Sequence, residues 1–232
     1  MLSRALGYID AQLAQIVNEL RSRQLASSTA IIISAKHGQS PIDPNLFTRI
    51  SDAPIIAAVN AAWTALHPGG APLVAGDTDD DAIMWWLSDR SRAATRFVAR
   101  YLMSHPATGN TATGGTRTLE HSGLQRVFAG RSAARYFGVP VGDPRHPDVW
   151  GVVQHGVVYT GGKGKIAEHG GANADDRDVL LTVYAPRAVA PQVVGRRVET
   201  TQIAPTIISL LGFSPKLLDA VRIEGTRTLP GA

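Results

Sequence analysis

Two histidines, each followed by glycine, are the side chains of this sequence best suited to bind a metal ion. His37 follows an apolar, β-branched segment and precedes Gly38, whereas His169 and Gly170 come before a second segment of that kind. A neutral imidazole is a good nitrogen ligand, and a neighbouring glycine lets the backbone approach a ligand closely. If both segments are strands of one sheet, the two rings can converge on one metal ion. The spacing alone leaves open the alternative that both are solvated loop histidines.

The segments near the histidines predict an α/β structure. Apolar residues recur every three or four positions over 2–20, which predicts an amphipathic helix. Residues 29–34 are apolar and β-branched, which predicts a central strand buried on both faces. His37 then lies in the loop at the carboxyl end of that strand, where ligands bind in open α/β sheets. Residues 178–184 predict another buried strand, and residues 201–212 predict a helix.

The middle of the chain is less regular. It predicts one helix and several short strands, with a loop rich in glycine and threonine over 109–115. The helix spans 91–104, and the strands span 72–75, 82–87, 127–128, 135–137, 148–153 and 156–159.

The composition excludes several classes of protein. The chain has 232 residues, of which 44% are hydrophobic and 18% charged, so it is long and apolar enough to bury a core. It has no Cys, which excludes disulfide scaffolds, Cys-ligated zinc and a thiol nucleophile. No apolar run reaches the roughly 20 residues that span a bilayer. The net charge of +4 is scattered along the chain without a recognition motif, so we expect no nucleic-acid partner.

Three stretches of the chain resemble the C-terminal half of the type I phosphodiesterase/nucleotide pyrophosphatase family, of the alkaline phosphatase superfamily. They contain TAIIISAKHGQSPID, then DPRHPDVWGVVQHGVVYTGGKGKIAEHGGANADDRDVLLTVYAP, and finally VETTQIAPTIISLLGFSPKLLDAVRIEGTRTLPG. The resemblance covers most of 1–60 and 140–232, and 60–140 matches loosely. It implies an α/β fold with a mixed, mostly parallel sheet flanked by helices, in which residues 1–232 are the C-terminal part of one alkaline phosphatase-like domain.

The resemblance also implies a chemistry, which is metal-dependent hydrolysis of phosphoesters. Members hold two metal ions, usually zinc, and use a Thr or Ser nucleophile. His37 matches the histidine of the family's Ser-Asp-His-Gly motif, and His169 matches a later His-Gly ligand. The implied substrates are small phosphate or sulfate esters. The sequence predicts neither the compartment nor a signal peptide.

This sequence departs from the family pattern in two ways. Lys36 stands where the family has an Asp ligand, and an ammonium group cannot bind a cation, although it can contact a phosphate or sulfate. The N-terminal half of the family's domain, which carries the nucleophile and further metal ligands, has no counterpart in this sequence. We therefore expect a fragment truncated at the N-terminus whose zinc site is incomplete, whose catalytic nucleophile is unknown and which is inactive without a companion N-terminal chain. The alternative is a non-catalytic pseudoenzyme or partner-binding remnant.

Two carboxylates are candidates for supporting the metal ligands. Glu168 is adjacent to His169 and could orient it, or it could simply be exposed. Asp10 lies on the apolar stripe of the first helix, where a buried carboxylate needs a partner. It is either a structural hydrogen-bonding residue near the site or a residue at the edge of the stripe.

Three other motifs predict structural rather than functional roles. Asp77, Asp79 and Asp81 have the spacing of a calcium loop but lack its glycine and closing glutamate. Residues 161–165 lack the full phosphate-binding pattern and predict a hairpin turn. Residues 145–148, with Arg145, His146 and Asp148, predict a polar structural loop.

Overall fold

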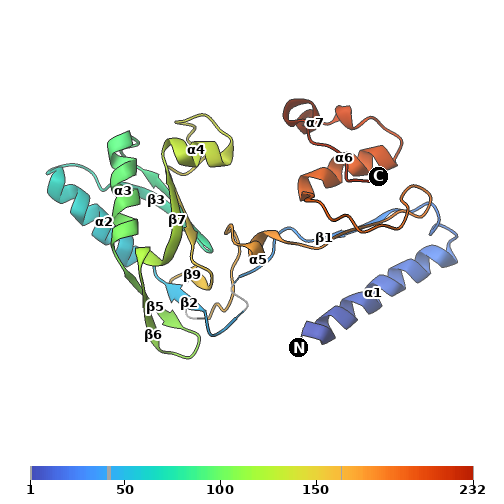
Figure 1. Cartoon of the computed structure of the whole chain (residues 1–232), viewed down its shortest axis with the longest axis horizontal. Coiled ribbons are helices and arrows are strands. Elements are labelled where there is room, and N and C mark those ends of the chain that lie inside the picture. Colours follow the sequence, from blue (N-terminus) through green and yellow to red (C-terminus); the bar gives the residue numbers. More distant parts are fainter. Residues whose placement is uncertain (1, 41–42, 163, 232) are drawn as a thin grey trace. The chain divides into compact units, whose positions relative to one another are not determined.

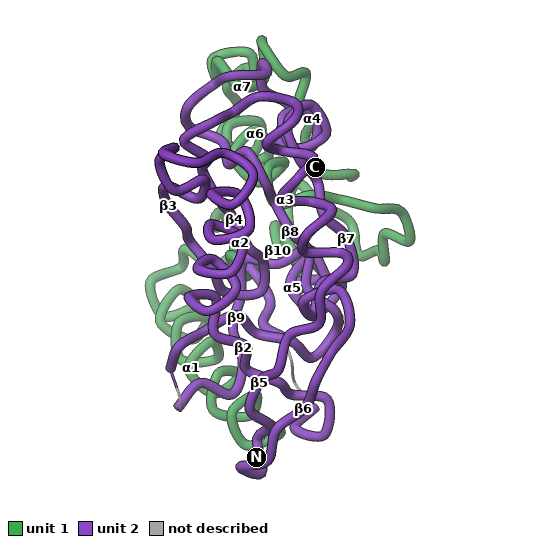
Figure 2. The backbone as a smooth tube through the Cα atoms, turned by 90° about the vertical axis from the view of Figure 1, so that its left-hand side faces the viewer, with its two compact units in different colours: residues 1–36, 180–232 green, residues 37–179 purple. Residues whose placement is uncertain are grey.

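The computed structural model describes residues 2–40, 43–162 and 164–231. The chain forms two compact units, coloured separately in Figure 2. The first combines residues 1–36 with 180–232, and the second comprises residues 37–179. Within the described ranges, no helix has the length and apolar character needed to cross a membrane. The prediction of one domain over the whole chain stays a prediction.

The described part of the first unit contains three α-helices and one two-stranded sheet, labelled in part in Figure 1. Strand β1 pairs antiparallel with β10, so that Ile31 lies opposite Tyr184 and Ser34 lies opposite Leu181. The elements are α1 (Leu2–Ser22), β1 (Ile31–Ser34), β10 (Leu181–Tyr184), α6 (Ile203–Leu210) and α7 (Asp219–Glu224), with short 3-10 turns at Thr200–Gln202 and Pro215–Leu217.

The amphipathic N-terminal helix is confirmed, but its apolar stripe is not buried. Leu6 is 58% exposed, Ile9 53% and Ile16 55%. Asp10 is exposed on the same helix, which agrees with the alternative that it lies at the edge of the stripe. Among the described residues, α1 has no extensive packing against another element.

The second unit is built from two four-stranded sheets with helices around them (Figure 1). One sheet has the order β6-β5-β2-β9 and the other the order β3-β4-β8-β7. The strands are β2 (Thr48–Ile50), β3 (Val74–Asp79), β4 (Ala82–Leu87), β5 (Ala107–Thr111), β6 (Thr116–Leu119), β7 (Leu124–Ala129), β8 (Val149–Val153) and β9 (Val157–Tyr159). The helices are α2 (Ala53–Leu66), α3 (Arg92–Ser104), α4 (Arg131–Phe137) and α5 (Ala174–Arg177), with a 3-10 turn at His121–Gly123.

The prediction of a mostly parallel sheet is wrong. The described residues form three small sheets, and the pairing of β2 with β9 is their one parallel pairing. Short turns explain two of the antiparallel pairings, because β3–β4 and β5–β6 are consecutive strands joined by a few residues, and such connections allow only antiparallel pairing. Strand β1 is only half-buried, since β10 is its single neighbour.

The core of the second unit lies where α2 and α3 pack on the β3-β4-β8-β7 sheet. Val59 and Trp63 of α2 meet Val98 of α3 and Trp85 of β4 in one buried cluster. The predicted strand over 148–153 is confirmed as β8, which is buried at every position. Helix α3 begins where expected, because the side chain of Ser91 accepts a hydrogen bond from the backbone N–H of Ala94.

Four local predictions are wrong. Residues 135–137 lie in helix α4 instead of a strand, and the 109–115 loop is part of the β5–β6 hairpin. Helix α2 was not predicted, although a Pro in its first turn marks its start. Strand β10 is half-exposed, not buried as expected.

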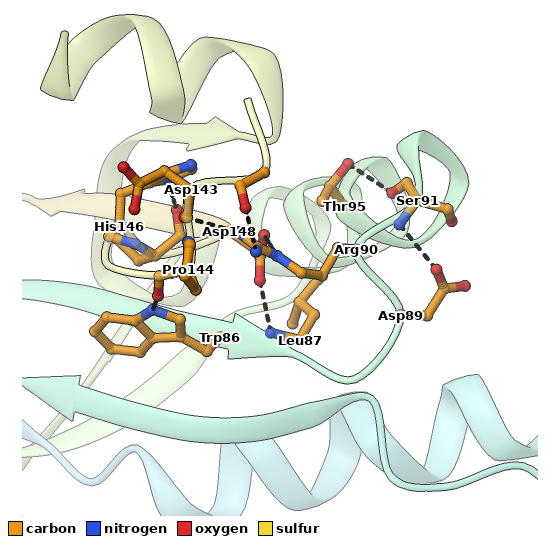
Figure 3. Close-up of polar contacts among 12 residues, drawn as sticks. Trp86, Leu87, Asp89, Arg90, Ser91, Thr95, Asp143, Pro144, His146 and Asp148 are labelled. Carbon is orange, nitrogen blue, oxygen red and sulfur yellow. Dashed lines mark hydrogen bonds and ion pairs between the residues drawn. The ribbon is translucent and has the colours of Figure 1, made fainter. Parts of the chain in front are cut away.

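The loop before β8 has the structural role that its sequence predicted. Asp148 is buried and accepts hydrogen bonds from Arg90 Nε at 2.6 Å and from the backbone N–H of Leu87 at 2.9 Å (Figure 3). Arg90 also donates to the carbonyl oxygens of Gly142 and Asp143. Asp148 therefore ties β4 and the residues before α3 to the start of β8.

We expect Asp148→Ala to lower the free energy of unfolding by about 3 kcal/mol, because a buried carboxylate that accepts from a charged group is among the costly hydrogen-bonding groups to remove. Urea denaturation measures the free energy of unfolding of the variant and of the unaltered protein. Arg145→Ala is the control, since the Arg145 side chain pairs with Asp143 at the surface and its loss should leave stability unchanged. Equal stability of the two variants would contradict the assignment.

Candidate metal centre

The two predicted metal-binding histidines are in direct contact within the second unit. The rings of His37 and His169 stack with their centroids 3.9 Å apart and their planes 22° from parallel. Both side chains are half-buried. The two residues are far apart in the sequence, so only the folding of the loops around them brings the imidazoles together.

Backbone hydrogen bonds hold the two histidine loops against each other. Ser40 and Glu168 form an antiparallel bridge with reciprocal N–H···O bonds of 2.9 and 2.7 Å. The N–H of Gly38 donates to the carbonyl of Asp176 at 2.8 Å. A Cβ at Gly38 would overlap the carbonyl oxygen of Asp175, so this glycine is required by loop packing.

The hydrogen bond of the His37 ring leaves one nitrogen free to bind a metal ion. Its Nδ1 lies 2.7 Å from the carbonyl oxygen of Gly38. A carbonyl can only accept, so Nδ1 carries the proton and Nε2 keeps its lone pair. Metal-binding histidines typically donate their second ring N–H to a carbonyl or carboxylate in this way. His37 thus fits the chemistry of a metal ligand.

A cluster of buried acids lies directly behind the histidine loops. Ser40, Asp81 and Asp176 expose 1%, 0% and 4% of their surface. The Ser40 Oγ lies 3.1 Å from Asp81 Oδ2 and 3.2 Å from both carboxylate oxygens of Asp176. Burial, followed by the nearby charge of Asp176, raises the pKa of Asp81 to about 8. The sequence did not point to Ser40 or Asp176, because no spacing rule connects these residues to the histidines.

The remaining predicted site residues have different surroundings. Glu168 is buried, not exposed, and forms an ion pair with Lys165. Lys165 also lies 3.3 Å from a carboxylate oxygen of Asp80, which connects this loop to the β3–β4 turn. Lys36 is exposed at the end of the first unit's N-terminal segment, and Asp10 is exposed on α1. Substrate contact by Lys36 and support of the metal ligands by Glu168 and Asp10 stay predictions.

A second acidic group could also hold a metal ion. Among the described residues, Asp52, Asp77 and Asp79 form a group in which one ligand oxygen of each lies within 4.8 Å of the others. Asp77 and Asp79 belong to the sequence motif with calcium-loop spacing, whereas Asp81 turns away into the cluster around Ser40. Both carboxylate oxygens of Asp79 are buried without a hydrogen-bond partner among the described residues, and burial, with Asp52 nearby, raises its pKa to about 8.

The raised pKa of Asp79 predicts a pH-dependent stability. In the unfolded chain this group ionises near pH 4, whereas in the folded chain it ionises near pH 8. The folded state therefore binds more protons between these values, and stability falls as the pH rises through this range. Asp79→Asn should make the unfolding free energy less dependent on pH between about 4 and 8.

Urea denaturation at a series of pH values measures this slope. Asp178→Asn, which changes an exposed carboxylate of the same unit, is the control. A slope in Asp79→Asn equal to that of the unaltered protein would contradict the assignment. A divalent cation held by the three carboxylates would favour ionised Asp79, so saturating Mg²⁺ should also reduce the slope.

The α/β architecture and the paired loop imidazoles define a candidate metal-binding α/β protein. The sequence profile of the type I phosphodiesterase/nucleotide pyrophosphatase family matches residues 2–175. The chain belongs to this metal-dependent family, which is part of the alkaline phosphatase superfamily. The matched range includes the middle segment, 60–140, where the resemblance was expected to be loose.

A solved structure supports the same fold. Human ectonucleotide pyrophosphatase/phosphodiesterase 5 superposes with a TM-score of 0.60 at 13% sequence identity. The match covers 92% of this chain and 48% of the human chain, so this chain spans about half the length of that structure. At this level of identity the likeness concerns the fold alone. The comparison with curated protein sequences returned no match.

Proposed function

We propose that this chain provides the histidine ligands of a divalent metal ion, zinc in the first instance, in a phosphoester hydrolase of the type I phosphodiesterase family. The contact between the rings of His37 and His169 carries this proposal. Family membership supports it, because the family is metal-dependent and its members act on phosphoesters.

The chain's own residues would have distinct roles in such a site. His37, with its proton on Nδ1, and His169 would bind the ion, while buried Glu168 orients the loop that carries His169. Lys36 precedes His37 and would attract the phosphate or sulfate group of a small ester as a point charge. When bound, a metal ion of this kind polarises a phosphoryl oxygen and stabilises the charge that develops on it.

The number of ligands limits what this chain achieves alone. A catalytic zinc usually has three protein ligands and one open position. The histidine pair supplies two nitrogen ligands. The group of carboxylates formed by Asp52, Asp77 and Asp79 is separate from this pair. The catalytic nucleophile is unknown. We therefore propose that the chain binds zinc weakly and does not hydrolyse phosphoesters by itself.

Two measurements test this proposal. Isothermal titration with Zn²⁺ should show binding that His37→Ala and His169→Ala each weaken, with His67→Ala, whose ring stacks on Trp63, as the control. Incubation with Zn²⁺ and an aryl phosphodiester should show no turnover above background. Zinc binding unaffected by both histidine variants would contradict the ligand assignment, and turnover that His37→Ala abolishes would contradict the inactivity of the isolated chain.

Binding of a partner chain is the second candidate function. The exposed apolar stripe of α1 favours it, because large apolar side chains that remain uncovered mark interaction surfaces. The strands β1 and β10 each have one partner among the described residues, so each leaves an edge available for pairing. The companion would be a second chain of the same family that carries the nucleophile half.

Co-expression with such a nucleophile-bearing chain should give a stable complex that hydrolyses the aryl phosphodiester. Ile9→Asp should weaken the complex, because it places a charge on the stripe, whereas Gln15→Asp on the opposite side of α1 should not. Light scattering coupled to gel filtration measures the assembly. Two chains that elute separately would contradict the companion, and a complex without hydrolysis would favour the pseudoenzyme.

A further inference from the structure

We propose that Ser40, Asp81 and Asp176 form a positioning network that sets the contact between His37 and His169, an inference that rests on the metal-binding function proposed above. Nothing in the family resemblance pointed to these three residues. Each of the three residues is hydrogen-bonded to one of the two histidine loops.

Each member of the network has one backbone connection beside a histidine. Ser40 pairs through its backbone with Glu168, the residue before His169. Asp176 accepts at its carbonyl from the N–H of Gly38, the residue after His37, and the N–H of Asp81 donates to the carbonyl of His169 at 3.4 Å. The three side chains meet behind these contacts, so a shift of any one of them moves a histidine loop.

The side-chain arrangement is too costly to be a simple stabilising contact. The single hydroxyl of Ser40 faces two carboxyl groups that are almost fully buried, and the Oδ1 of Asp81 has no hydrogen-bond partner among the described residues. Buried acids with unsatisfied oxygens lower stability. Positions where a fold breaks such rules are expected to be functional, and here the network lies against the histidine pair.

Close packing makes the network sensitive to small changes. A Cβ at Gly171 would lie 2.5 Å from Asp176 Oδ2 and 2.6 Å from the carbonyl oxygen of Asp81. Real contacts of this kind are not that short, so the loop after His169 fits against the two acids without room for a methyl group. The loop after His169 is therefore packed directly against both Asp81 and Asp176.

Zinc titration of the full chain tests the network. Asp176→Ala should weaken zinc binding by about 10–100-fold, the usual effect of removing a residue that orients metal ligands. Asp176→Asn keeps the shape and an acceptor for Ser40, so it should restore affinity near that of the unaltered protein. Thr95→Val, which removes another buried hydroxyl of the same unit, is the control for a general loss of stability.

The outcomes separate positioning from a merely structural role. Far below the melting temperature all variants are folded, so a loss of stability alone leaves zinc affinity unchanged. Asp176→Ala with unaltered zinc affinity, or Thr95→Val with the same loss of affinity as Asp176→Ala, would overturn the proposal.

A second measurement keeps this inference distinct from the proposed function. If the unaltered protein binds no zinc, the metal-binding function fails, and the network is then judged by nuclear Overhauser contacts between the His37 and His169 rings. The inference predicts that these contacts persist in Asp176→Asn and disappear in Asp176→Ala. Contacts that persist in Asp176→Ala would overturn it.

Discussion

The candidate site depends on one antiparallel bridge, in which Ser40 and Glu168 exchange two backbone hydrogen bonds. This bridge joins the loop after β1 to the loop that carries His169. The histidine rings can stack only because the loops are joined in this register, since each ring is a short distance along the chain from the bridge. A different register would separate the rings, whatever the local sequences.

The second unit gathers acidic side chains into two separate groups, and strand geometry explains the division. Asp77 and Asp79 are two positions apart on β3, so their side chains share one face of the sheet, where Asp52 at the start of α2 meets them. Asp81 comes after the turn and lies instead beside Ser40 and Asp176. Asp77, Asp79 and Asp81 are evenly spaced in the sequence but lie in two different environments. Burial raises the pKa of Asp79 in one environment and the pKa of Asp81 in the other.

The chain belongs to the phosphodiesterase family, and its structure resembles part of the fold of the human chain, of which it spans about half. The exposed apolar stripe of α1 and the short β1–β10 pair have the features of elements that make further contacts. By contrast, the second unit has a core of its own under α2 and α3. The physical division therefore places the histidine pair in the better packed of the two units.

Local patterns in the sequence determined the elements that local forces stabilise. The periodic helix that became α1, the helix over 91–104 that became α3 and the strand that became β8 were all predicted, because the apolar period of a segment acts within a few residues. The two histidines were also identified, through their glycines and their likeness to a family motif.

Only the tertiary structure decided how these pieces combine. It made the sheets mostly antiparallel, since connections and long-range pairing, and not strand composition, set strand direction. It also assembled Ser40, Asp81 and Asp176 from three distant parts of the chain. Contacts between residues so far apart leave no period or spacing in a single sequence, so this network could be found only in the folded chain.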